Sequence, residues 1–253
     1  MTMVPKGKVI IANLCNSDNR SDFSAVLSNN KQARIEVITT ILKTEVKIKE
    51  LYCSTFKKLG YENIGFMHIP DNEFLEGDFN NRLSHTDIVC FMDDHFDIVH
   101  ILKHTLLWEP LQKKYFLDEN FLVIGLNNGA SSLAEMFVKR KGIGCGLGFI
   151  QNCIMDLEKD NSNSLKKLIY HTIINNKYLG IKIPAGTFLI VDKGCYVYCR
   201  GEKPLLIFNA RSIEKSSIEK VKRGKSIYAK NLKGQILSQG IFNMHSGEYQ
   251  RIS

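Results

Sequence analysis

The stretch VIGLNNGA, residues 123 to 130, joins an apolar run of strand length to a turn flanked by glycines. Its frame, Gly-Leu-Asn-Asn-Gly from 125 to 129, has the Gly-x-nucleophile-x-Gly spacing of a nucleophile elbow, a strained strand-to-helix turn that lifts one side chain out of the backbone. The middle residue of such an elbow is Ser or Cys, whereas here it is Asn127. The stretch therefore predicts an α/β sheet with an elbow, and leaves open whether that elbow carries out chemistry.

Composition and charge narrow the classes of protein to which the chain can belong. With 253 residues, of which 44% are hydrophobic, the chain can bury a sizeable core. The net charge of +8 comes largely from lysines spread along the chain, and the densest run, EKSSIEKVKRGK at 214–225, contains no aromatic residue. A nucleic-acid binder more often concentrates its positive charge beside stacking aromatic residues. Binding of nucleic acid or another polyanion is therefore a hypothesis that the sequence disfavours.

The N-terminal residues and the cysteines indicate a reducing compartment. The apolar run near the N-terminus is too short for the core of a signal peptide or for a membrane span. The seven cysteines are scattered and form no CxxC pair, so neither a disulfide framework nor a zinc knuckle is indicated. We therefore expect a cytoplasmic protein with reduced thiols and no membrane contact.

Apolar strands alternate with helical segments along the first part of the chain. Runs of strand length lie at 8–13, 34–40, 63–69, 87–92 and 120–126. Helices are predicted at 44–58, 95–115 and 130–142. The alternation is typical of a mostly parallel central sheet flanked by helices, here as a single domain over 1–253 with a β-hairpin extension at 186–210. In such a sheet Asn13, Asp93 and Asn127 would lie at the carboxyl ends of strands.

In order and spacing, these segments resemble one known family. The chain carries in succession KVIIANL, FKKLGYENIGFMHI, TDIVCFMDDHF, VIGLNNGASSLAEMF, GLGFIQNCIMD and YLGIKIPAGTFLIV. The series is similar to the cyanophycinase and aspartyl-dipeptidase serine peptidases, whose fold resembles that of class I glutamine amidotransferases. The resemblance implies a flavodoxin-like α/β fold and, in the family, a Ser nucleophile within a Gly-Thr-Ser-Ala-Gly-Ala motif at the elbow.

Carried over residue by residue, the resemblance implies that the catalytic groups of the family are replaced in this chain. The nucleophilic Ser corresponds to Asn127, whose amide is not nucleophilic. The His base corresponds to Glu158, and the acid that orients it corresponds to Ala185 in GIKIPAGT. The glycine pair near the oxyanion corresponds to Asp93 and Asp94, whose carboxylates would repel a developing negative charge.

With nucleophile, base and orienting acid all replaced, the sequence predicts binding without catalysis. We interpret the chain as a pseudoenzyme, a catalytically inactive homologue without a cofactor, that binds a peptide-like small ligand or a cyanophycin-type polymer. The expected ligand-binding residues are Asn127, Asn128, Asp93, Asp94 and Glu158. The alternative hypothesis is an active cyanophycinase-like or dipeptidase hydrolase that uses non-standard residues.

Asp97, His100 and His104 form a cluster with the spacing of a metal site. They lie three and four residues apart, so a helix would present them on one face. Acidic residues near a helix N-terminus and histidines on a helix surface are nevertheless common without metal, and the sequence contains no HExxH motif. We therefore predict no metal site.

The stretch ILKHTLLWEPL, residues 101 to 111, predicts an interface with another chain. It contains the only Trp of the protein and more large apolar residues than one buried helix stripe requires. The family that the chain resembles is commonly dimeric. We therefore expect a homodimer, or a heterodimer in which the chain regulates an active relative.

Overall fold

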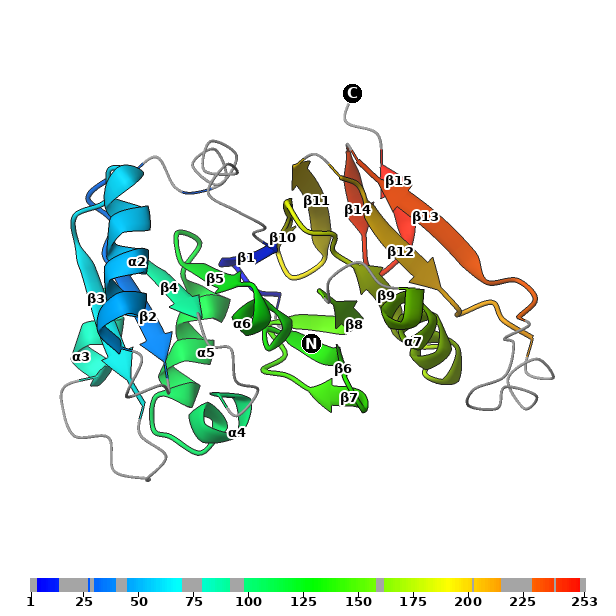
Figure 1. The fold of residues 1–253 in the computed structure, drawn as a ribbon, viewed down its shortest axis with the longest axis horizontal. Coiled ribbons are helices and arrows are strands. Elements are labelled where there is room, and N and C mark those ends of the chain that lie inside the picture. The colour runs from blue at the N-terminus through cyan, green and yellow to red at the C-terminus, as the bar shows by residue number, and fades with distance from the viewer. Residues whose placement is uncertain are drawn as a thin grey trace.

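The computed structural model describes residues 4–13, 27, 30–39, 45–69, 79–91, 98–157, 162–201, 203–214, 229–238 and 240–250. Within these residues the strands form two sheets (Figure 1). The larger sheet has the order β15-β14-β11-β10-β1-β5-β4-β2-β3, and the smaller has the order β13-β12-β9-β8-β6-β7. Both sheets are mixed and are flanked by helices, which confirms the α/β class predicted from the sequence.

The five strands expected from the apolar runs form the parallel half of the larger sheet. They are β1 (Lys8–Asn13), β2 (Ile35–Thr39), β3 (Ile64–His68), β4 (Ile88–Phe91) and β5 (Leu122–Leu126). They pair in parallel in the order β3-β2-β4-β5-β1. Because both faces of this half are covered, β2, β4 and β5 are buried along their whole length.

Helices cover the two faces of this parallel half. The predicted helix at 44–58 is confirmed as α2 (Glu45–Lys58), whose Phe56 packs into the cluster on one face of the sheet. On the other face lie α3 (Phe79–Ser84), α4 (Ile98–Lys103) and α5 (Trp108–Leu117). None of the helices in the described ranges is long and apolar enough to cross a membrane.

The helix predicted at 95–115 is interrupted in the structure. Residues 95–97 lie outside the described residues, and the rest forms α4 and α5, which are separated by a turn over residues 104–107. Pro110 explains the break, because a proline in the middle of a continuous helix would clash with the carbonyl four residues earlier, whereas the first turn of α5 tolerates it. The Thr105 hydroxyl closes the turn by donating to the carbonyl of Leu102 at 2.8 Å.

The predicted β-hairpin extension is confirmed on the other side of β1. The hairpin consists of β10 (Thr187–Asp192) and β11 (Tyr196–Gly201), and β10 pairs antiparallel with β1. The strands β14 (Ile241–Asn243) and β15 (Glu248–Gln250) continue the sheet beyond β11. The larger sheet is therefore parallel on one side of β1 and antiparallel on the other.

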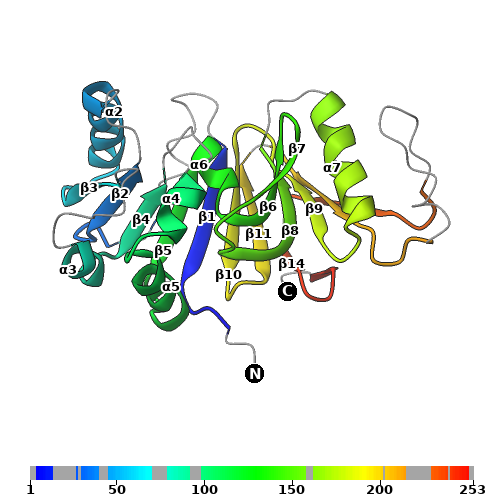
Figure 2. The same ribbon diagram turned by 90° about the horizontal axis from the view of Figure 1, so that it is seen from below.

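The smaller sheet packs against one face of β10 and β11, with one helix on its outer face (Figure 2). Its strands are β6 (Ala134–Lys139), β7 (Gly142–Cys145), β8 (Ile150–Asp156), β9 (Leu179–Lys182), β12 (Leu205–Asn209) and β13 (Lys233–Leu237). The helix α7 (Ser162–Ile174) packs Leu168 against Val138 and Ile154 of this sheet. Nothing in the sequence pattern predicts that these strands leave the central sheet.

The helix predicted at 130–142 is wrong. Only the four-residue α6 (Asn128–Ser131) is helical, and the chain then enters β6, which pairs antiparallel with β7 and in parallel with β8. The carboxylate of Glu135 on β6 accepts the backbone N–H of Asn152 at 2.8 Å and the hydroxyl of Tyr178 at 3.0 Å. These contacts with distant parts of the chain outweigh the local helical periodicity.

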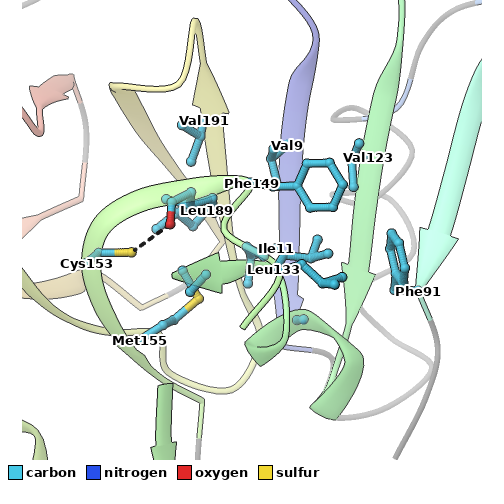
Figure 3. Packing of buried hydrophobic residues seen from close by; sticks show 14 of the residues in the cluster. Val9, Ile11, Phe91, Val123, Leu133, Phe149, Cys153, Met155, Leu189 and Val191 are labelled. Atoms are coloured by element: carbon cyan, nitrogen blue, oxygen red, sulfur yellow. Dashed lines mark hydrogen bonds between the residues drawn. The ribbon is translucent and has the colours of Figure 1, made fainter. Parts of the chain in front are cut away.

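The main core lies between the two sheets. Figure 3 shows Val9 and Ile11 of β1 facing Phe149 and Leu133, which come from the segments around the smaller sheet. All are buried, and the same cluster extends to residues of α4, α5, β11 and β14. The hydroxyl of Tyr115 on α5 donates to the carbonyl of Phe149 at 3.0 Å inside this core. A second cluster lies on the opposite face of the larger sheet, beneath α2.

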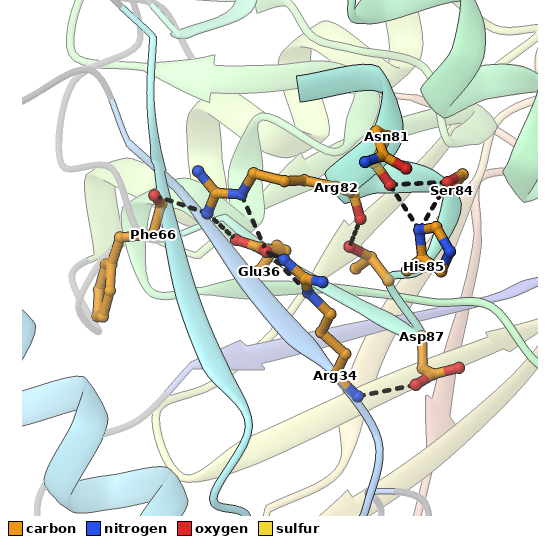
Figure 4. Close-up of polar contacts among 9 residues, drawn as sticks. Arg34, Glu36, Phe66, Asn81, Arg82, Ser84, His85 and Asp87 are labelled. Carbon is orange, nitrogen blue, oxygen red and sulfur yellow. Dashed lines mark hydrogen bonds and ion pairs between the residues drawn. The ribbon is translucent and has the colours of Figure 1, made fainter. Parts of the chain in front are cut away.

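A buried carboxylate links the outer strands of the larger sheet to α3. Glu36 on β2 is fully buried, and it accepts hydrogen bonds from the guanidinium groups of Arg34 and Arg82 (Figure 4). Arg82 also donates to the carbonyl of Phe66 on β3 at 3.0 Å. The carboxylate occupies the space that a Cβ atom at Gly65 would need, so a larger residue there would displace Glu36 from its two arginines. Two positive groups thus compensate one buried negative charge.

Candidate functional site

The turn after β5 has the strained backbone expected of an elbow. Asn127 has φ 51° and ψ −120°, a combination that residues other than glycine rarely adopt. Two backbone hydrogen bonds hold it: its N–H donates to the carbonyl of Ala12 at 2.8 Å, and its carbonyl accepts the N–H of Ala130 at 3.1 Å. The strained turn between strand and helix predicted from the glycine spacing is therefore present.

Gly125 is required because α6 lies against the end of β5. A Cβ atom at this position would come within 2.5 Å of Cα of Ala130 and within 2.9 Å of a methyl group of Leu133. The carbonyl of Gly129, the second glycine of the frame, accepts the hydroxyl of Ser132 at 2.6 Å. The elbow is thus fixed by close packing of backbone on backbone.

Asn13 connects the end of β1 to two strands of the other sheet. Its side-chain nitrogen Nδ2 donates to the carbonyl of Ile183 at 2.9 Å and to that of Leu157 at 3.3 Å. Its own carbonyl accepts the N–H of Gly186 at 2.7 Å. The ends of β1, β8 and β9 therefore meet at Asn13. The preceding residue, Ala12, accepts the hydrogen bond from the N–H of Asn127 in the elbow.

Of the three positions that correspond to the triad of the family that the sequence resembles, the structure describes Asn127 and Ala185, and both lie near this junction. Ala185 lies half-buried in the turn between β9 and β10, next to Gly186. Leu157, whose carbonyl Asn13 binds, directly precedes Glu158. Asn13 ends β1 and Asn127 follows β5, its parallel neighbour, so both lie at carboxyl ends of strands as expected. Glu158 itself lies outside the described residues.

The other predicted site residues are placed only in part. Asp93, Asp94 and Asp97 lie outside the described residues, as does the side chain of Asn128. His100 and His104 are both exposed, and their ring centroids are 4.6 Å apart in an edge-to-face arrangement. Among the residues that the structure describes, no group of three His, Cys, Asp or Glu side chains is arranged to hold a metal. The metal prediction stays a prediction, because Asp97 belongs to the cluster.

A buried ionic network that the sequence analysis did not identify lies directly behind this junction. The Nζ atom of Lys182 on β9 donates to a carboxylate oxygen of Asp156 on β8 at 2.9 Å and to the hydroxyl of Ser164 at 2.8 Å. The Ser164 hydroxyl donates to the same carboxylate oxygen. All three residues are buried, and Asp156 and Lys182 are partners in the parallel register. A lysine at the end of the apolar strand LGIK was the only signal in the sequence.

Comparison with known proteins extends the description of the fold. No protein-family model and no curated protein matches the sequence. A peptidase from an acI-B1 Actinobacterium superimposes with a TM-score of 0.65 over 95% of this chain and 98% of its own, at 14% identity. A peptidase E-type protein from Listeria monocytogenes EGD-e does so with a TM-score of 0.54 over 78% of this chain and 99% of its own, also at 14% identity. The chain has a peptidase E-type fold.

Within this fold the cysteines with shifted pKa values are poor candidates for a substitute nucleophile. Burial raises the pKa of the Cys153 thiol to about 12 and raises that of Cys90 still further. Burial also raises the pKa values of Cys195 and Cys199, near the hairpin β10–β11. The thiolate is the nucleophilic form, and a raised pKa keeps these thiols protonated at neutral pH.

Proposed function

We propose that the chain is a catalytically inactive relative of peptidase E-type proteins and that it binds a peptide-like ligand at the elbow. The observation that carries this proposal is Asn127, whose backbone has the elbow conformation while its side chain is an amide. The amide nitrogen is conjugated with its carbonyl and is too weakly acidic for a protein base to convert it into a nucleophile at neutral pH. The turn has the backbone of an elbow, but its central side chain has no attacking group.

The other triad-equivalent positions support the same proposal. Ala185, where the family that the sequence resembles has the acid that orients its base, has only a methyl group. Glu158 replaces the histidine base, and a carboxylate cannot relay a proton from an amide that does not ionise. Losing several members of a unit that acts together removes the activity as a whole.

The chemistry of the junction suggests the class of ligand. The side chain of Asn127 offers both a hydrogen-bond donor and an acceptor, as does every peptide group of a ligand. A peptide-like small molecule or a cyanophycin-type polymer is therefore the ligand that we propose, with Asn127, Asn128, Asp93, Asp94 and Glu158 as the contact residues.

A hydrolysis assay tests the absence of catalysis. Purified full-length protein is incubated with cyanophycin or with an Asp-Arg dipeptide, and the release of dipeptides or of free Asp is followed. We expect no turnover by the natural chain and none by Asn127→Ser, because the restored hydroxyl would still lack the histidine base and the orienting acid with which it acts as a unit. Turnover that follows the protein through purification and is lost in Asn127→Ala would overturn the proposal in favour of an active hydrolase with non-standard residues.

A calorimetric titration with the same Asp-Arg dipeptide tests binding. We expect Asn127→Ala to weaken binding by roughly tenfold, the effect of losing one or two hydrogen bonds. The matched control is Asn120→Ala, because Asn120 is exposed in the turn before β5, at the opposite end of that strand from the elbow. Equal affinities of the two variants would place the ligand elsewhere, and no heat of binding to any of the three proteins would contradict a site for this ligand.

A further inference from the structure

The backbone of Asn127 also brings its own side chain close to the next peptide bond. Its ψ is −120°. The other three substituents of Cα are evenly spaced around the Cα–C bond. At this ψ, viewed along that bond, the bond from Cα to Cβ of Asn127 and the bond from C to the backbone nitrogen of Asn128 point in the same direction. The two atoms are eclipsed, an arrangement that an unconstrained chain avoids.

An eclipsed Cβ and backbone nitrogen are what a five-membered succinimide ring requires. The ring contains Cα, Cβ, Cγ and C of Asn127 and the backbone nitrogen of Asn128. We propose that Asn127 is a site of self-modification, at which the backbone nitrogen of Asn128 attacks the side-chain carbonyl carbon of Asn127. The fold thus holds the electrophile and the nucleophile of this reaction in the orientation of the product.

The atoms of the reaction balance without an external oxidant or cofactor. The bond from the nitrogen of Asn128 to Cγ of Asn127 forms, the bond from Cγ to Nδ2 breaks, and ammonia leaves with the proton of the attacking N–H. Water then opens the ring at one of its two carbonyls. Opening at Cγ gives aspartate at position 127, and opening at the backbone carbonyl gives isoaspartate. Asn127 is only half-buried, so water has access to it.

Asn127 and Asn128 should form the succinimide in opposite orders of rate in the folded and in the unfolded chain. Asn128 precedes Gly129, and in an unfolded chain an Asn-Gly pair reacts faster than Asn-Asn because glycine offers no steric hindrance and is flexible. In the structure Asn128 is the first residue of α6. At the ψ of a helix, about −42°, the backbone nitrogen of Gly129 is rotated away from the Cβ atom of Asn128, so the two are not eclipsed. The native chain should therefore react at Asn127 and the unfolded chain at Asn128.

The contacts of the elbow maintain this geometry. The hydrogen bonds of Asn127 with Ala12 and Ala130 fix the peptide groups on both sides, and the close approach at Gly125 leaves no room for the turn to relax. The inference goes beyond the proposed function and does not depend on it, because the reaction needs only Asn127, the next peptide bond and water.

Mass spectrometry of natural full-length protein tests the inference without a variant. One sample is kept folded in mildly alkaline buffer and another is unfolded in urea at the same pH. Both are digested at mildly acidic pH, and conversion of amide to acid at 127 and at 128 is measured over time, with isoaspartate identified by its fragment ions. We expect severalfold faster conversion at Asn127 than at Asn128 in the folded chain and the reverse order in urea.

Two variants provide matched controls for the assignment. Asn127→Gln, whose extra methylene prevents closure of a five-membered ring, should lose conversion in the folded chain. Asn128→Gln should retain conversion at 127 in the folded chain and lose the fast reaction in urea. Faster conversion at 128 than at 127 in folded natural protein would overturn the proposal, as would a folded chain that stays unmodified while the urea sample reacts to completion.

Discussion

At the scale of single residues, Asn127 carries strain that its surroundings must compensate. A non-glycine residue at φ 51° costs free energy of order 1–3 kcal/mol and persists only where packing determines the backbone. Here the compensation comes from the hydrogen bond to Ala12 and from the contact of α6 with Gly125. Retaining such a backbone without a nucleophile is consistent with a turn used for binding.

Gly125→Ala should destabilise the protein. Its Cβ would lie 2.5 Å from Cα of Ala130, so the backbone of the elbow would have to shift. We expect the free energy of unfolding to fall by about 1–3 kcal/mol, measured by urea denaturation. The matched control is Gly234→Ala on β13, where the nearest atom is 3.9 Å away. If the two substitutions lower the free energy of unfolding equally, the close approach at Gly125 is not what makes a side chain there unfavourable.

Burial determines which cysteines can react. The pKa of Cys153 is raised to about 12 and that of Cys90 is raised further, whereas Cys145 on β7 is exposed. Because a raised pKa keeps the protonated thiol at any pH below it, a thiol reagent at slightly alkaline pH should modify Cys145 and leave Cys90 and Cys153 intact. Peptide mass spectrometry measures the modification of each site. Labelling of Cys153 in the folded chain would contradict the structure, and labelling in urea serves as the positive control.

At the scale of elements, local patterns predict the first half of the chain better than the second. The runs that became β1 to β5 are short, apolar and bounded by polar residues, so their structure is decided locally. The segment 130–142 fits either a helix or a strand, and only its pairing with β7 and β8 decides it. The elbow could be predicted because glycine spacing is local. The ion pair of Asp156 with Lys182 could not, because it depends on the register of two strands.

Lys182→Met tests the network that holds β8 and β9 beside the elbow. The substitution would leave the carboxylate of Asp156 buried without its cation, so we expect the free energy of unfolding to fall by about 3–5 kcal/mol in urea denaturation. Lys230→Met is the matched control, since the ion pair of Lys230 with Glu214 is largely exposed and should contribute less than about 1 kcal/mol.

A double variant separates the loss of the charge pair from the loss of packing. Adding Asp156→Leu to Lys182→Met removes the stranded carboxylate, and the double variant should regain much of the lost stability. If the double variant is as unstable as Lys182→Met alone, the aliphatic part of the lysine side chain and not its charge is what holds the two strands together.

At the scale of the whole molecule, the two sheets share the main core, and few of the large apolar side chains that the structure describes are exposed. The stretch 101–111, which the sequence predicts as an interface, contributes Leu102, Leu107 and Leu111 to that core. Trp108 is half-buried against it. Most of the large apolar residues of this stretch are thus buried or half-buried within the chain. Leu106, which is 81% exposed, is the one that remains most available for contact with a partner.

We propose that Leu106 lies in a homodimer interface, and Leu106→Arg tests this. Burial of one leucine in the interface contributes about 1.5–3 kcal/mol to dimer stability, and this contribution would be lost. The arginine would also place a charge without a partner in an apolar contact, so the dimer should weaken by about tenfold or more. Light scattering over a range of concentrations measures the effect. Ile236→Arg is the matched control, because Ile236 on β13 is similarly exposed, at 72%, but lies in the other sheet. A natural chain that is monomeric at micromolar concentration, or an equal response to the two substitutions, would show that the α4–α5 turn is not the interface.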